Sequence, residues 1–108
     1  MMSEIILIRV NCPSEDLAAS LAEAAVKGHL AACANIEGPI ASVYHWDGKI
    51  ERGEEYVLWL KTRADRWSDV ETLVSALHPD DTPAILAIPC VHANARYEAW
   101  LSANSKAD

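Results

Sequence analysis

The fold is decided at the centre of the chain, by the stretch Tyr44-His45-Trp46-Asp47-Gly48-Lys49-Ile50. An Asp-Gly pair between two apolar runs is a strong signal for a two-residue β-turn, because both turn positions need positive φ. We therefore predict a hairpin around this pair. Extended chain precedes it at residues 30–36 and 40–46, interrupted at Gly38-Pro39, and the return strand covers residues 49–62.

The predicted hairpin is too long for one small domain to cover. Each arm holds roughly 14 to 16 residues, which at about 3.3 Å per residue makes a ribbon of about 45 to 50 Å. A compact chain of this length is only about 35 Å across. Either the hairpin bends at Gly38-Pro39 and Gly53, or its far end packs on another subunit. The second interpretation is favoured by Tyr44 and Trp46, since exposed aromatics on an edge strand promote association.

Strands and helices alternate around the hairpin. Two segments repeat apolar residues at helical spacing, and two β-branched apolar runs predict further strands. The element order is strand, helix, strand, strand, helix, strand, helix, which predicts an α+β fold with a ferredoxin-like antiparallel sheet (βαββαβ) plus a C-terminal helix. The predicted segments are a strand at 5–10, a helix at 13–28, a helix from Trp67 to about His78, a strand at 84–91 and a short helix from Asn94.

Length and charge limit the classes of protein and partner. The 108 residues, 51% of them hydrophobic, fit a single domain spanning residues 1–108. A net charge of -7 argues against nucleic acid and anionic membranes as partners, because both attract clustered Lys and Arg. The apolar run near the start is too short to span a membrane and lacks the basic flank of a signal peptide. We expect neither a nucleic-acid-binding nor a membrane protein.

The cysteines and the absence of catalytic motifs give two further expectations. Cys12, Cys33 and Cys90 are odd in number and scattered, which predicts reduced thiols and a cytoplasmic protein. The sequence has no nucleophile elbow, no phosphate-binding Gly-rich loop and no metalloprotease spacing. We therefore expect no enzymatic activity.

Several segments of this sequence resemble the CutA divalent-cation tolerance family. In order and spacing they cover most of the chain, from about Ile5 to Leu101. The matching segments are Leu30-Ala31-Ala32-Cys33-Ala34-Asn35, Tyr44-His45-Trp46-Asp47-Gly48-Lys49-Ile50, Leu60-Lys61-Thr62, His78-Pro79 with Thr82-Pro83, and Tyr97-Glu98-Ala99-Trp100-Leu101. The resemblance implies a homotrimer whose long hairpins wrap neighbouring subunits. It also implies a role in copper tolerance and divalent-metal response, without a settled enzymatic reaction.

The resemblance points to a metal site made from a first-strand cysteine and a histidine before the proline that ends the second helix. His78 matches that histidine, whereas Leu77 stands where some members have a second one. A gapless alignment places Val10 at the thiol position, and Cys12, two residues on, keeps the same strand face. Cys12 and His78 are therefore the predicted ligands for copper or another divalent metal.

Topology gives a separate reason to place these residues together. In a ferredoxin-like sheet, Cys12, His78, Asp80 and Asp81 share one end. A thiolate with an imidazole suits copper or zinc, but two ligands need a neighbouring subunit, water or a carboxylate to complete a site. The alternative interpretation is that Cys12 is a small buried residue and His78 a polar helix terminus favoured by the dipole.

Two other groups of residues are weaker candidates. Cys90-Val91-His92 places a thiol and an imidazole on one strand face, at the opposite end of the sheet from the first pair. Lys61, with Trp59, Tyr44 and Trp46, lines a cleft between subunits in one interpretation, where an anionic metabolite would bind. In the other, Lys61 only lays its aliphatic stem along the hairpin.

The function favoured by these observations is a trimeric metal-response protein that binds copper or another divalent metal without turnover. The alternatives are a trimeric small-ligand sensor, with a metabolite in the clefts between subunits, and a structural scaffold for an unknown partner protein.

Overall fold

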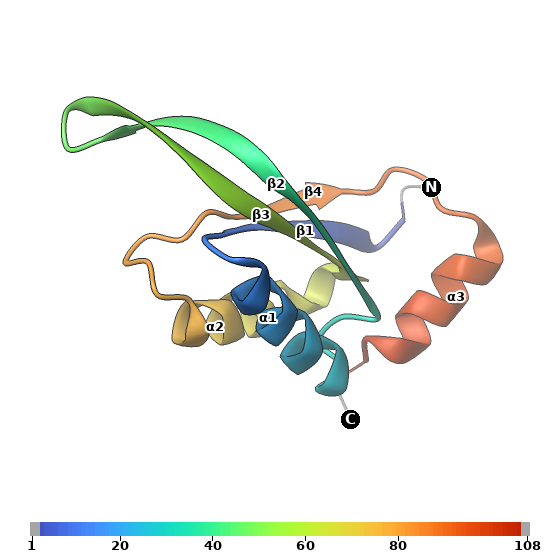
Figure 1. Ribbon diagram of the computed structural model, residues 1–108. Coiled ribbons are helices and arrows are strands. Elements are labelled where there is room, and N and C mark those ends of the chain that lie inside the picture. The colour runs from blue at the N-terminus through green and yellow to red at the C-terminus, as the bar shows by residue number, and fades with distance from the viewer. Residues whose placement is uncertain (1–2, 107–108) are drawn as a thin grey trace.

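The computed structural model describes residues 3–106 and confirms the predicted element order (Figure 1). All neighbouring strands are antiparallel, in the order β2-β3-β1-β4. This is the ferredoxin-like α+β arrangement expected from the sequence. The elements are β1 (Ile5–Cys12), α1 (Glu15–Lys27), β2 (Cys33–Trp46), β3 (Lys49–Arg63), η1 (Ala64–Arg66), α2 (Trp67–Leu77), β4 (Ile85–Pro89) and α3 (Ala95–Asn104).

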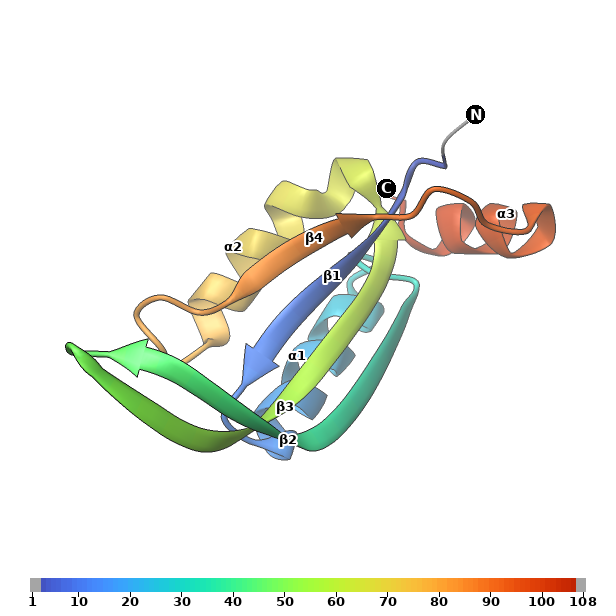
Figure 2. The same cartoon turned by 90° about the horizontal axis from the view of Figure 1, so that it is seen from above.

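The main core lies between the sheet and the helices α1 and α2, which cover the same face of the sheet (Figure 1). Alternate residues of the central strands point to this face, as the twofold repeat of a strand requires. Figure 2 shows α3 beyond the end of the sheet, where Leu101 packs with Ile5 and Ala32 in a second cluster. Fully buried core residues include Ile8, Val10, Leu21, Leu58, Leu60, Val70 and Val74. No helix within residues 3–106 is long and apolar enough to cross a membrane.

Local sequence explains where α1 begins and ends. The Oγ of Ser14 accepts a hydrogen bond from the Leu17 N–H at 3.1 Å, so Ser14 is the N-cap. Pro13 therefore lies before the helix, whereas the sequence suggested that it lies in the first turn. The helix starts after Ser14 because the Ser14 hydroxyl caps it. At the other end Gly28 is the C-cap, as predicted, and donates its N–H to the Ala24 carbonyl.

The hairpin bends near its middle, and its far half also extends beyond the rest of the subunit. The turn is at Asp47 and Gly48, with φ of 51° and 76°, as predicted. A bulge between Glu37 and Ile40 shifts the register, and the ribbon bends there (Figure 2). The far half still extends past the rest of the molecule, which measures 45 Å along its long axis with the hairpin included (Figure 1). Its exposed apolar side chains are Val43, Tyr44, Trp46 and Ile50.

Because the hairpin bends at Gly38, we expect an alanine at Gly38 to destabilise the protein more than an alanine at Gly48. At Gly38, φ is +148° and an added Cβ would lie 2.7 Å from Cδ2 of Tyr56, whereas at Gly48 it would meet open space. We expect Gly38→Ala to lower the free energy of unfolding by about 3 kcal/mol and Gly48→Ala by about 1 kcal/mol. Denaturant unfolding of both variants measures this, and equal losses would contradict the packing at Gly38.

Candidate functional site

The predicted metal ligands do come together at one end of the sheet. Cys12 is the last residue of β1 and lies opposite Tyr56 of β3. His78 is the C-cap of α2, and its Nε2 lies 2.8 Å from the carbonyl oxygen of Asn11. Asp80 follows in the next turn. The sheet topology therefore places Cys12, His78 and Asp80 at the same end of the sheet, as the sequence predicted.

Both nitrogens of the His78 imidazole are already hydrogen-bonded. The backbone N–H of Asp80 donates to Nδ1 at 3.1 Å, so Nδ1 carries no proton. Nε2 therefore carries the proton of the neutral ring and donates it to Asn11. The His78 side chain is fully buried, and the nearer Asp80 carboxylate oxygen is 3.9 Å from Nδ1. His78 thus joins the end of α2 to the end of β1.

The Cys12 thiol is neutral at physiological pH. Its side chain is fully buried, and burial is the largest cause that raises the pKa of the thiol to about 11, followed by the negative charges of Glu55 and Asp80. Its Sγ lies 3.9 Å from the Val10 carbonyl oxygen, a weak contact. A metal ligand must be a thiolate, so this environment opposes coordination.

The residues at this end do not form a complete metal site by themselves in the arrangement that the structure describes. Within residues 3–106, no group of three or more His, Cys, Asp and Glu side chains is placed to hold one. Coordination by Cys12 and His78 would require loss of the thiol proton and rupture of a His78 hydrogen bond. Their role as metal ligands stays a prediction, and their contacts match the structural interpretation of the pair.

The second candidate group lies at the other end of the sheet, as expected, but the prediction that it occupies one strand face was wrong, because β4 ends at Pro89. Cys90 donates its N–H to the Ile5 carbonyl at the start of β1. Its Sγ donates to the backbone carbonyl of His92 at 3.2 Å. The Oγ of Ser3 donates to the Cys90 carbonyl at 2.5 Å. The Cys90 thiol is therefore engaged with the backbone, not with the His92 ring.

Lys61 has a partner that the sequence did not suggest. Its Nζ lies 5.8 Å from the centre of the Tyr97 ring, on α3, within the range of a cation–π contact. Tyr44 and Trp46 lie far along the hairpin, so one subunit does not gather them around Lys61. Periodicity along single segments could not reveal this pair, because it depends on how α3 packs beside the sheet.

Trp59 is the centre of a second polar cluster on the sheet. Its Nε1 donates to Oε1 of Glu37 at 2.6 Å, and the guanidinium carbon of Arg9 lies 5.7 Å from its ring. These three residues occupy cross-strand or diagonal positions on the face opposite α1 and α2. The sheet face opposite the helices therefore carries two charged side chains, Arg9 and Glu37, beside the Trp59 ring.

Comparison with known proteins gives consistent results. Residues 6–104 match the family model described as CutA1 divalent ion tolerance protein. The chain is 38% identical over 104 residues to the divalent-cation tolerance protein CutA of Thermus thermophilus, covering 96% of this chain and 99% of that protein. It is 35% identical over 92 residues to human protein CutA, covering 85% of this chain and 51% of that protein.

Solved structures show the same likeness. The divalent cation tolerance protein from Thermus thermophilus superposes with a TM-score of 0.92 at 34% identity, over 94% of this chain and 99% of that chain. CutA1 from Oryza sativa gives a TM-score of 0.94 at 32% identity, over 99% and 98% of the two chains.

The buried thiol predicts a loss of stability at alkaline pH. Cys12 has a pKa of about 11 in the folded chain against 9.0 for a free thiol, so between these values the unfolded chain loses a proton that the folded chain keeps. The free energy of unfolding should therefore fall as the pH rises through this window, by on the order of 2 kcal/mol from Cys12 alone. The free energy of unfolding of the natural protein and of Cys12→Ala is measured by denaturation across this pH range. The difference between the two proteins isolates the effect of the thiol from the titration of Lys and Tyr residues. Identical slopes for the two proteins would contradict the assignment.

Proposed function

The chain belongs to the CutA1 divalent ion tolerance family, and we propose on that premise that it acts in the response to divalent metal ions as a homotrimer. In this proposal it binds copper or another divalent metal weakly and catalyses no reaction. We also propose a cytoplasmic location, supported by three cysteines that are all free. The observation that carries the assembly is the apolar, uncovered far half of the β2–β3 hairpin.

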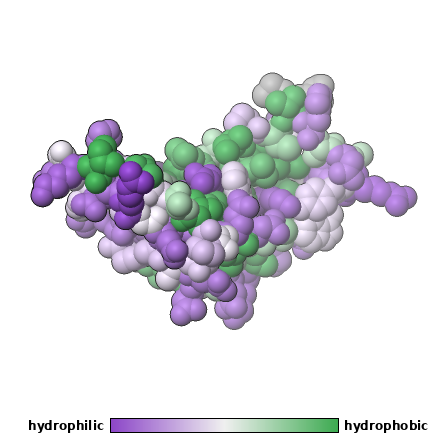
Figure 3. All heavy atoms as spheres, turned by 45° about the horizontal axis from the view of Figure 1, so that its top comes forward, coloured by the Kyte–Doolittle hydropathy of each residue, from purple (hydrophilic) through white to green (hydrophobic). Residues whose placement is uncertain are grey.

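The hairpin surface is costly to leave in water. Trp46 is 66% exposed and Val43 61%, and both project from the arm that extends past the body of the molecule. Figure 3 shows a small group of hydrophobic side chains among hydrophilic ones at this extremity, and more hydrophobic side chains over the middle of the molecule. Each Å² of apolar surface removed from water contributes roughly 25 cal/mol, so covering these side chains with a neighbour favours assembly.

The open edges of the sheet support the same conclusion. β2 and β4 are the edge strands, and β4 carries the exposed apolar residues Leu86 and Ile88. Exposed apolar edge strands tend to pair with another chain unless a protein protects them. The number of three subunits rests on the family resemblance, and the exposed apolar surface supports the proposal that a subunit has partners.

The environment of Cys12 and His78 favours weak over tight binding of a metal. A metal at Cys12 and His78 competes with the thiol proton and with the hydrogen bonds to Asn11 and Asp80. Each of these opposes coordination, and a further donor from a neighbouring subunit or water is needed. The relative from Thermus thermophilus is named a divalent-cation tolerance protein, which supports a role with divalent cations.

A small-ligand sensor is the second candidate, and the uncovered sheet face favours it. Arg9, Trp59 and Lys61 present two cations and an aromatic ring, beside the single carboxylate of Glu37, on a face that α1 and α2 do not cover. Such a set suits an anionic metabolite between subunits. A thermal shift with metabolites but not with copper or zinc would favour the sensor. A shift with neither would favour a scaffold for a partner protein.

Substitution on the hairpin is expected to break the assembly. Light scattering should give the natural protein a mass of three times 11.8 kDa. Trp46→Ser removes an aromatic side chain from the far half of the hairpin, so a lower mass or a concentration-dependent mass is expected. The control is Val26→Ser, which changes an exposed apolar residue of α1, away from the hairpin. It should leave the mass unchanged. A natural protein that is monomeric at all concentrations would refute the trimer.

Copper titration tests the predicted ligands directly. We expect the affinity of the reduced protein for copper to fall about tenfold or more in Cys12→Ser and in His78→Ala, because each removes one of two protein donors. His29→Asn, which changes an exposed histidine after α1 and away from the hairpin, is the matched control and should bind as the natural protein does. Circular dichroism checks that each variant folds. Unchanged affinity in both site variants would remove this pair from the metal role.

A further inference from the structure

The far half of the β2–β3 hairpin, beyond the bulge, carries apolar side chains on both of its faces. Side chains alternate between the faces of a strand, so Tyr44 and Trp46 share one face and Val43 points to the other. Ile50 lies directly opposite His45, which places it on the same face as Val43. The four apolar side chains are between 44% and 66% exposed in the single subunit.

Apolar residues on both faces are the pattern of a strand that is buried on both faces. A strand with one face on a core and the other in water alternates apolar and polar residues instead. Figure 1 shows the far half rising away from α1 and α2, which lie beneath the rest of the sheet. A two-stranded ribbon without packing partners is only marginally stable in water. The far half therefore needs a packing partner on each face.

The charges of the subunit favour a second copy of the chain as that partner. The turn and the far half of β3, residues 47–55, hold four acidic and two basic residues. The sheet face opposite the helices carries Arg9 and Lys61 beside the single carboxylate of Glu37. Within residues 3–106, neither of these two cations is in an ion pair. An acidic hairpin of one copy thus complements the cationic sheet face of another.

We infer, on the basis of the homotrimer proposed above, that the far half of each hairpin is enclosed between the two other copies of the chain, one on each face. In a closed ring every subunit has two neighbours, so a ribbon that projects from one subunit can contact both. An occupant on one face alone would leave either Tyr44 and Trp46 or Val43 and Ile50 in water. The hairpin then joins all three copies and is more than a contact between two.

Two double variants test the two faces separately. Tyr44→Thr with Trp46→Thr removes the apolar side chains of one face, and Val43→Thr with Ile50→Thr removes those of the other. Threonine is favoured in strands, so the hairpin itself is kept. The readout is the rate at which unlabelled and ¹⁵N-labelled assemblies exchange subunits, followed by native mass spectrometry. We expect each double variant either to exchange at least about tenfold faster than the natural protein or to dissociate, because each loses apolar contact area.

The matched control is Val26→Thr, which makes the same change as Val43→Thr on the exposed surface of α1. It should exchange subunits at the natural rate. The four substituted hairpin residues belong to neither buried cluster, so both double variants are expected to fold, and circular dichroism checks this.

The outcomes separate this inference from the homotrimer on which it rests. Faster exchange or dissociation in both double variants supports enclosure on two faces. A trimer in which only one double variant changes the exchange rate overturns the inference and keeps the trimer, because the hairpin then lies on one neighbour with its other face in water. A trimer that neither double variant affects also overturns it. A natural protein that is monomeric at every concentration removes the homotrimer itself.

Discussion

The pairing of β1 with β3 is the constraint on which the rest of this structure depends. Ile8 lies opposite Leu60 and Val10 opposite Leu58, and all four are fully buried beneath the helices. A shift of one residue in this register would turn the whole set to the other face of the sheet. Because that would expose the core to water, the register is strongly specified, and it determines which side chains arrive at each end of the sheet.

The same register explains the character of the Cys12 and His78 pair. Continuing the alternation of Ile8 and Val10 by one step buries Cys12, and burial raises the pKa of its thiol and keeps it protonated. The carbonyl of Asn11 then meets His78 from α2. Residues that resemble metal ligands in the sequence thus act in the folded subunit as a joint between a strand and a helix. Coordination of a metal there competes with the interactions that hold this joint.

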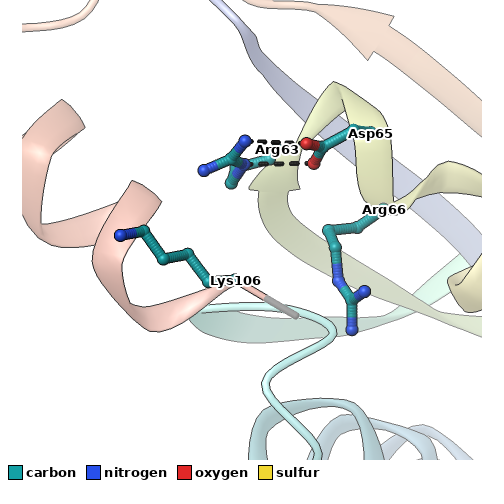
Figure 4. Close-up of a pocket in the computed structure, with 4 residues that line it drawn as sticks. All are labelled: Arg63, Asp65, Arg66 and Lys106. Carbon is teal, nitrogen blue, oxygen red and sulfur yellow. Dashed lines mark hydrogen bonds and ion pairs between the residues drawn. The ribbon is translucent and has the colours of Figure 1, made fainter. Parts of the chain in front are cut away.

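The two ends of β3 have different chemistry. At its start, the hairpin presents apolar side chains that a neighbouring subunit would cover. At its end, Arg63 leads into η1 and a cavity that is also lined by Arg66 and Lys106 (Figure 4). The exposed apolar side chains of the hairpin and the charged residues around Arg63 are therefore separated by the length of this strand.

The sequence by itself determined the element order, the turn at Asp47 and Gly48, and the C-terminal ends of α1 and α2, because each depends on the local chemistry of a few neighbouring residues. It also placed Cys12 and His78 at one end of the sheet, since the order of elements restricts the topology. Only the tertiary structure decided the tautomer of His78, the burial of Arg66 and the contact of Lys61 with Tyr97. These depend on residues distant in the chain meeting at a given distance, and no periodicity within one segment carries that information.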